Sequence, residues 1–102
     1  MLDNQPSTMF ATLDTPSVLI DLDVAERNVN RFQSFANKAK ITVRPHIKTH
    51  KLPRLAKAQI KAGAVGITCQ KISEAEVMAN AGLDDIVITY NILSVSKLDR
   101  LN

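Results

Sequence analysis

Residues 44–51, Arg-Pro-His-Ile-Lys-Thr-His-Lys, hold the densest set of side chains in this sequence that can do chemistry. Both histidines of the chain lie here, together with one arginine and two lysines. Three kinds of site could use such a cluster: a patch that binds anions or nucleic acid, a metal site, or the reactive centre of an enzyme that works through a lysine amine. The rest of the sequence separates them.

Composition argues against the nucleic-acid patch. The formal charge of +3 arises from 13 Lys+Arg against 10 Asp+Glu, and only 4% of the residues are aromatic. A weakly basic chain without interleaved aromatic side chains offers no stacking platform for bases. We expect no nucleic-acid partner.

The spacing of the two histidines argues against a metal site. His46 and His50 stand four positions apart, which would place both imidazoles on one face of a helix, but Pro45 and Thr49 disfavour a helix here. The single cysteine, Cys69, excludes an internal disulfide and fits a reducing compartment, where a small buried core residue is expected. We therefore assign no metal ligands in this chain.

The hydrophobic pattern is that of one small globular domain, with 45% hydrophobic and 23% charged residues in 102. No uninterrupted apolar run approaches 18 residues, and residues 1–15 lack the layout of a signal peptide. We expect a cytoplasmic protein with no membrane partner.

Strand-like and helix-like stretches alternate along the chain. Short apolar runs predict strands at 17–21, 41–47, 65–69 and 86–90. Apolar residues at helical spacing and capping patterns predict four helices. The first runs from an N-cap at Asp23 to about residue 39, and the second covers 52–62 and stops at Gly63. The third runs from a Ser73–Glu76 capping box to Gly82, and the fourth begins at Ser94 or Ser96. This alternation predicts an α/β fold with a parallel sheet.

The predicted strand gives the basic cluster a direction. If 41–48 is extended, Val43, Pro45 and Ile47 point toward the covering helices, and Arg44, His46 and Lys48 point to the opposite face together with Thr42. In a parallel barrel that face is the interior, and Lys48 would lie at the carboxyl rim where barrel enzymes hold their chemistry. Burial among cations favours a neutral amine, which is the form that attacks a carbonyl group.

The same residues carry a resemblance to a known family. The strings RPHIKTHK, TCQKISEAE and AGLDDIVITYN, preceded by TPSVLIDLDVAERNVNRF, resemble the N-terminal part of the alanine-racemase-like, fold-type III pyridoxal-phosphate enzymes, in the D-threonine aldolase and D-serine dehydratase branch. The resemblance runs from Thr15 to the end. It implies an N-terminal tail at 1–15 and, at 16–102, three or four βα units of a pyridoxal-phosphate-binding, TIM-like (β/α)8 barrel.

The resemblance also implies roles for residues at matching positions. Lys48 matches the catalytic lysine that holds pyridoxal phosphate as a Schiff base. Arg44, His46 and His50 lie in the same motif and would orient that lysine and tune its charge, and Arg44 and His46 would also bind the cofactor. Gln70 is a cofactor-pocket candidate because it follows a predicted strand, and Tyr90 and Asn91 are weaker candidates on the same ground.

The implied function is that of an N-terminal piece of a pyridoxal-phosphate-dependent lyase that acts on small-molecule D-amino acids or 3-hydroxy amino acids. In the family, later segments supply the phosphate-binding loops, a second domain and a divalent-metal site, and full-length members are expected to be homodimers. These 102 residues contain neither the phosphate-binding loops nor the metal ligands of the family, so we expect no turnover by this chain alone. The alternative is a non-catalytic truncated remnant or a pyridoxal-phosphate carrier protein of the same barrel family.

Overall fold

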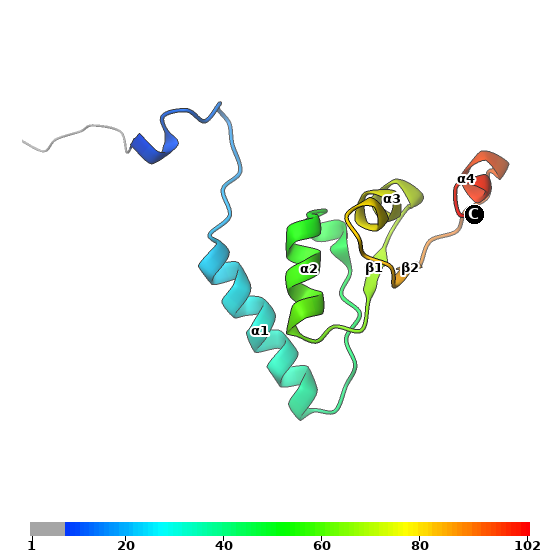
Figure 1. Cartoon of the computed structure of the whole chain (residues 1–102), viewed down its shortest axis with the longest axis horizontal. Helices are drawn as coiled ribbons and strands as arrows, with labels where there is room; N and C mark the ends of the chain where they lie inside the picture. Colours follow the sequence, from blue (N-terminus) through cyan, green and yellow to red (C-terminus); the bar gives the residue numbers. More distant parts are fainter. Residues whose placement is uncertain (1–7) are drawn as a thin grey trace, which may run out of the picture.

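The computed structural model describes residues 8–102, which form an α/β arrangement (Figure 1). In chain order the elements are η1 (Thr8–Phe10), α1 (Leu22–Lys38), η2 (Ile47–Thr49), α2 (Pro53–Ala62), β1 (Ile67–Cys69), α3 (Ile72–Asn80), β2 (Ile86–Ile88) and α4 (Val95–Asp99). The fold class predicted from the alternating pattern is therefore confirmed.

The strands β1 and β2 form a parallel pair, with Ile67 opposite Ile86 and Cys69 opposite Ile88. Helix α3 is the crossover between them and packs on both strands. The core gathers where the strands, η2 and the helices meet, and its buried members are Ile47, Ala56, Ile67, Cys69, Met78 and Leu83. The strands predicted at 65–69 and 86–90 are thus present, each shortened to three residues.

The strand predicted at 41–47 is not formed as a regular strand. This segment runs beside β1 and makes one isolated parallel bridge, between His46 and Thr68. The Val65 N–H donates to the Val43 carbonyl at 3.0 Å and the Thr68 N–H to the Pro45 carbonyl at 2.8 Å. Because Pro45 has no N–H to donate, and because η2 begins two residues later, the ladder cannot continue.

The strand predicted at 17–21 is also absent. Residues 17–20 are exposed, Val18 to 93%, and the chain there runs apart from the sheet (Figure 1). An apolar run forms a strand only when a neighbouring strand satisfies its backbone groups, and the described residues supply none at this position.

Two helix starts differ from their predicted positions. Asp21, and not Asp23, is the N-cap of α1, because its carboxylate accepts the Val24 N–H at 3.1 Å. The Ser73–Glu76 capping box is not formed: α3 begins at Ile72, and its N-cap Lys71 makes no side-chain capping bond.

The other predicted helix ends are confirmed. Helix α2 begins at Pro53 and stops at Gly63, whose φ of +127° suits glycine. Gly82 follows the end of α3 with φ of +92°, and Ser94 caps α4 by accepting the Lys97 N–H at 3.4 Å.

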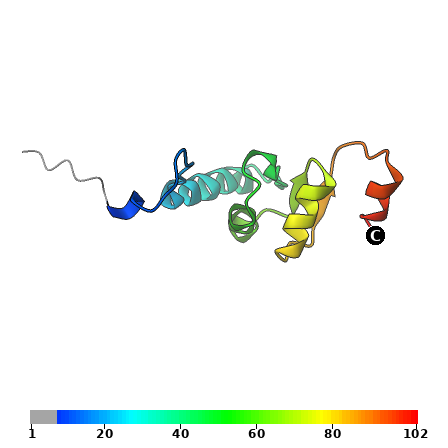
Figure 2. The ribbon, with the colours of Figure 1, turned by 90° about the horizontal axis from the view of Figure 1, so that it is seen from above.

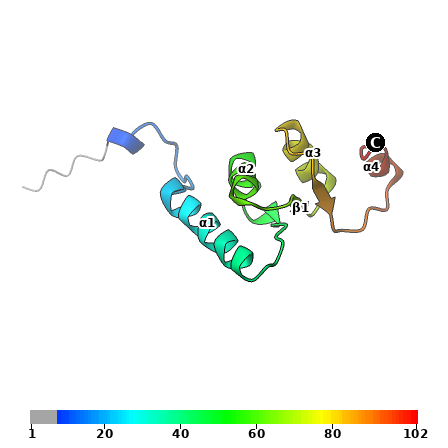
Figure 3. The ribbon, with the colours of Figure 1, turned by 60° about the horizontal axis from the view of Figure 1, so that its bottom comes forward.

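The described chain is open rather than rounded. Helix α1 packs against α2 at an angle, while α4 stands apart at the end of an extended connection (Figures 2 and 3). The radius of gyration is 17.9 Å, whereas a compact domain of this length has about 13 Å. Within the described part of the chain, no helix has the length and apolar character needed to cross a membrane.

Candidate functional site

Lys48 lies in a short turn at the carboxyl end of the parallel strands. The bridge between His46 and Thr68 is one residue before the end of β1, so η2 leaves the sheet at that edge. Ile47 is fully buried and anchors the turn, and its carbonyl accepts the N–H groups of His50 and Lys51 at 3.2 and 2.7 Å. Lys48 itself is exposed. The turn, and not an extended strand, determines where the Lys48 side chain lies. The sequence predicted a buried lysine, and this lysine is exposed.

The two histidines shape the same turn. His46 Nδ1 accepts the Lys48 N–H at 3.2 Å, and His50 Nδ1 accepts the Leu52 N–H at 3.0 Å. With Nδ1 as acceptor, the ring proton of His50 is on Nε2, which lies 3.2 Å from Gln59 Oε1 and donates to it. No group of three potential metal-binding side chains occurs within residues 8–102.

Arg44 lies at the other end of the sheet from Lys48. Its Nη1 atom is 2.7 Å from Asp85 Oδ1, and it also donates to the carbonyls of Asp85 at 3.2 Å and Ile67 at 3.5 Å. Ile67 opens β1 and Asp85 directly precedes β2, so this contact is at the amino ends of the strands. The hydrogen bond from Arg44 holds the pKa of the Asp85 carboxyl group below its usual value. The structure therefore does not bring Arg44 next to Lys48.

Gln70 joins the two weaker strand-end candidates. It is exposed directly after β1, and it lines a cavity of about 340 Å³ with Tyr90 and Asn91, which follow β2. Because both strands are parallel, their carboxyl ends meet at one edge, as the sequence pattern implied. Lys97 of α4 adds a cationic side chain to this cavity.

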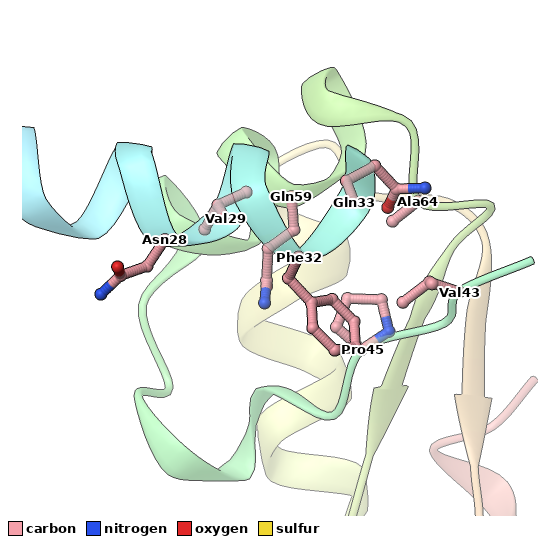
Figure 4. A pocket seen from close by; sticks show the side chains of 8 residues that line it. All are labelled: Asn28, Val29, Phe32, Gln33, Val43, Pro45, Gln59 and Ala64. Carbon is pink, nitrogen blue, oxygen red and sulfur yellow. The ribbon is translucent and has the colours of Figure 1, made fainter. Parts of the chain in front are cut away.

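A second cleft, of about 230 Å³, lies on the helix-facing side of the 43–45 segment (Figure 4). The side chains of Phe32, Val43 and Pro45 approach one another there, which confirms that Val43 and Pro45 face the helices. This cleft offers no acid, base or nucleophile, because none of the side chains that line it is titratable and Lys48 is not among them. The lining residues are Asn28, Val29, Phe32, Gln33, Val43, Pro45, Gln59 and Ala64.

One acidic residue in the site was not found from the sequence. Glu74 is buried, and its Oε2 atom accepts the Gln70 N–H at 2.9 Å, while Oε1 lies 3.7 Å from Lys51 Nζ. The assignment of Ser73 as N-cap, with Glu76 in a capping box, hid the role of Glu74, because the observed N-cap is Lys71, two residues earlier. The neighbouring Cys69 is buried as predicted, and burial, followed by the charge of Glu74, raises the pKa of its thiol.

Comparison with known proteins decides the kinship. Residues 20–102 match the family described as alanine racemase, N-terminal domain. The chain belongs to this family. The family resemblance seen in the RPHIKTHK and TCQKISEAE strings is thereby confirmed.

Relatives within this family are lyases by name. The chain is 42% identical over 97 residues to a D-threonine aldolase of Arthrobacter sp., which covers 95% of this chain and 26% of that protein. It is 46% identical over 76 residues to the D-threo-3-hydroxyaspartate dehydratase of Delftia sp. (strain HT23), covering 74% of this chain and 20% of that one. The crystal structure of D-threonine aldolase from Filomicrobium marinum superposes with a TM-score of 0.83 at 43% identity, over 87% of this chain and 24% of that chain. The chain thus spans about a quarter of the length of these relatives.

Proposed function

We propose that this chain is the N-terminal part of a pyridoxal-phosphate-dependent lyase acting on D-amino acids or 3-hydroxy amino acids, with Lys48 as the residue that holds the cofactor. Kinship with proteins named as aldolase and dehydratase supports the reaction class. The single observation that carries the assignment of Lys48 is its position: an exposed amine on a turn anchored by buried Ile47, at the carboxyl edge of parallel strands.

The amines in the turn differ in how well they suit an aldehyde cofactor. Such a cofactor needs a primary amine that solvent reaches and that no carboxylate holds. Lys48 is exposed and has no ion-pair partner among residues 8–102, whereas Lys51 is paired with the buried Glu74. Covalent attachment at Lys51 would remove the ammonium that compensates a buried charge, so the chemistry favours Lys48.

The proposed roles of the other residues follow from their contacts. When bound, pyridoxal phosphate supplies an electron sink for negative charge at the substrate α-carbon. In this chain Lys48 Nζ would carry the proton exchanged there, and His46 orients the lysine by accepting its backbone N–H. Gln70 lines the cavity of about 340 Å³ with Tyr90 and Asn91, at the carboxyl edge of the same strands. We propose that Arg44 supports the site indirectly, by fixing the amino ends of the strands through Asp85.

Reductive labelling tests the assignment of the cofactor lysine. The chain is incubated with pyridoxal phosphate, reduced with borohydride and mapped by peptide mass spectrometry. We expect the mass increase on the peptide that carries Lys48, and loss of the visible absorbance band of the bound cofactor in Lys48→Ala. Lys57→Ala, which removes an exposed lysine of α2, is the matched control and should keep the band. A label concentrated on Lys51, or spread evenly over the exposed lysines, would refute the assignment.

A chimera tests the lyase reaction. This chain replaces the matching quarter of the Arthrobacter D-threonine aldolase, and acetaldehyde release from D-threonine is measured. We expect the chimera to be active and Lys48→Ala to lower its turnover by at least about a hundredfold, which is the scale of losing a positioned proton carrier. A chimera whose turnover is unaffected by Lys48→Ala would contradict the proposed role, and a folded, cofactor-binding chimera without turnover would favour the carrier alternative.

A further inference from the structure

Glu74 is a buried acidic residue, and burial of a charged carboxylate is unfavourable unless other groups compensate the charge. Its side chain is 5% exposed. Oε2 is satisfied by the Gln70 N–H, but Oε1 is buried and has no hydrogen-bond partner among the described residues. A carboxylate removed from water in this way normally has a compensating cation or a specific task.

The compensating cation is Lys51, whose Nζ atom lies 3.7 Å from Oε1. This separation is that of an ion pair and is longer than a hydrogen bond. The cavity beside Glu74 does not bring a solute to Oε1, because that atom has almost no accessible surface. Lys51 is therefore the group through which Glu74 acts.

Lys51 closes the turn that carries Lys48. Its N–H donates to the Ile47 carbonyl at 2.7 Å, and its φ of +55° lies in the left-handed region, which a side chain adopts at a cost. A residue in this conformation persists only when its surroundings hold it. The ion pair to Glu74 is such a restraint, applied three residues after Lys48.

The other oxygen of Glu74 holds the second loop of the same edge. By accepting the Gln70 N–H, Oε2 fixes the backbone where β1 ends and the lining of the neighbouring cavity begins. One carboxylate thus connects the turn after the 41–47 segment with the loop after β1. The first follows a segment that makes one parallel bridge to β1, the second follows β1 itself, and they carry Lys48 and Gln70.

We infer that Glu74 is a positioning residue, which clamps the Lys48 turn onto the end of β1 through Lys51 on one side and the Gln70 backbone on the other. Among the described residues it forms no hydrogen bond or ion pair with Lys48; its polar contacts are the Gln70 N–H and Lys51 Nζ. The inference deepens the proposed function and rests on it, because it assigns the purpose of the clamp to Lys48. It also explains why the amine of Lys51 is kept out of the reaction.

The test measures where and how fast the cofactor attaches, independently of turnover. In the chain incubated with pyridoxal phosphate, the rate of absorbance change and the ratio of reduced label on Lys48 and Lys51 are determined. Glu74→Gln keeps the shape of the side chain and removes its charge. We expect about a tenfold slower attachment at Lys48 and a clear rise of label on Lys51, whose ammonium is released. A merely structural loss would lower both labels without changing their ratio.

Lys51 variants keep the inference testable even where Glu74→Gln fails to fold, because Lys51 is 57% exposed. Lys51→Met keeps the aliphatic stem and should slow attachment at Lys48 as Glu74→Gln does, whereas Lys51→Arg preserves the cation and should restore it. Lys57→Met is the matched surface control. An unchanged label ratio in folded Glu74→Gln, or a parental rate in Lys51→Met, overturns the inference alone. Absence of label from Lys48 in the parent chain overturns the proposed function, and the inference with it.

Discussion

The contact between Arg44 and Asp85 gives the chain a pH-dependent bond at the amino end of its sheet. Arg44 Nη1 lies 2.7 Å from Asp85 Oδ1, and this hydrogen bond lowers the pKa of Asp85. A carboxyl group whose pKa is lower in the folded chain stabilises the fold above its unfolded pKa, about 3.9 for aspartate, and this stabilisation is lost as the pH falls through the folded value.

We therefore predict that Asp85→Asn lowers the melting temperature at pH 7, and that the difference from the parent shrinks as the pH falls below about 4. The reason is that protonation of Asp85 in the parent removes the same charge that the substitution removes. Thermal melts followed by circular dichroism between pH 7 and pH 3 measure this difference. A gap that stays constant over the whole range would show that the pair contributes no pH-dependent stability.

At the residue scale, the sequence indicated which residues are candidates for the site better than it indicated where their side chains lie. The alternation of Val43 and Pro45 toward the helices was readable, because side-chain direction follows from extended backbone. The alternation ended at Ile47, where burial and the start of η2 override it, so Lys48 is presented by a turn. The pairing of Lys51 with Glu74 was not readable, since it depends on how two distant segments pack.

At the element scale, the entry to β1 depends on a glycine for space. Gly66 is buried between the 41–47 segment and β2. A Cβ atom on it would lie 2.1 Å from Arg44 Nη1 and 2.7 Å from the Asp85 carbonyl oxygen. The guanidinium can move, but the carbonyl belongs to the backbone that leads into β2. The glycine thus allows Arg44 to cross the strand ends.

We predict that Gly66→Ala destabilises the chain by about 1–3 kcal/mol, the usual cost of overpacking a closely packed position. Urea unfolding followed by circular dichroism measures the change. The control is Lys57→Ala on the exposed face of α2, which should stay within about 0.5 kcal/mol of the parent. Equal stability of Gly66→Ala and the parent would mean that β1 and β2 can separate here without cost.

The order of helices and central strands was predictable from the sequence, because apolar periodicity and Gly or Pro boundaries act locally. Helix α2 shows this, with Pro53 at its start and Gly63 at its end. The two strands that were predicted and not formed failed for different reasons. Among residues 8–102 no strand lies beside 17–21, which is a nonlocal cause, whereas Pro45 interrupts the ladder of 41–47 from within that segment.

At the scale of the whole molecule, the described chain leaves apolar surface uncovered. Phe35 on α1 is 68% exposed, and Leu93, before α4, is 88% exposed. The two-stranded sheet and the long principal extent of 63 Å match this open shape. Exposed apolar side chains and unpaired strand edges favour association with another surface. In the (β/α)8 barrel that the family resemblance implies, further strands and helices would cover them.

We predict that the 102-residue chain self-associates, and that a large part of the association energy comes from the outer face of α1. Phe35→Ser should weaken association by about ten- to a hundredfold, because burying most of a phenylalanine contributes about 1.5–3 kcal/mol and 1.4 kcal/mol corresponds to a factor of ten. Lys57→Ser, an exposed polar position of α2, should leave the association constant unchanged. Sedimentation velocity over a concentration series measures the constant, and circular dichroism confirms that each variant keeps its helices. A parent chain that sediments as a monomer at every concentration, with a sharp cooperative melt, would contradict the prediction and would show that residues 8–102 form a self-sufficient unit despite their exposed apolar faces.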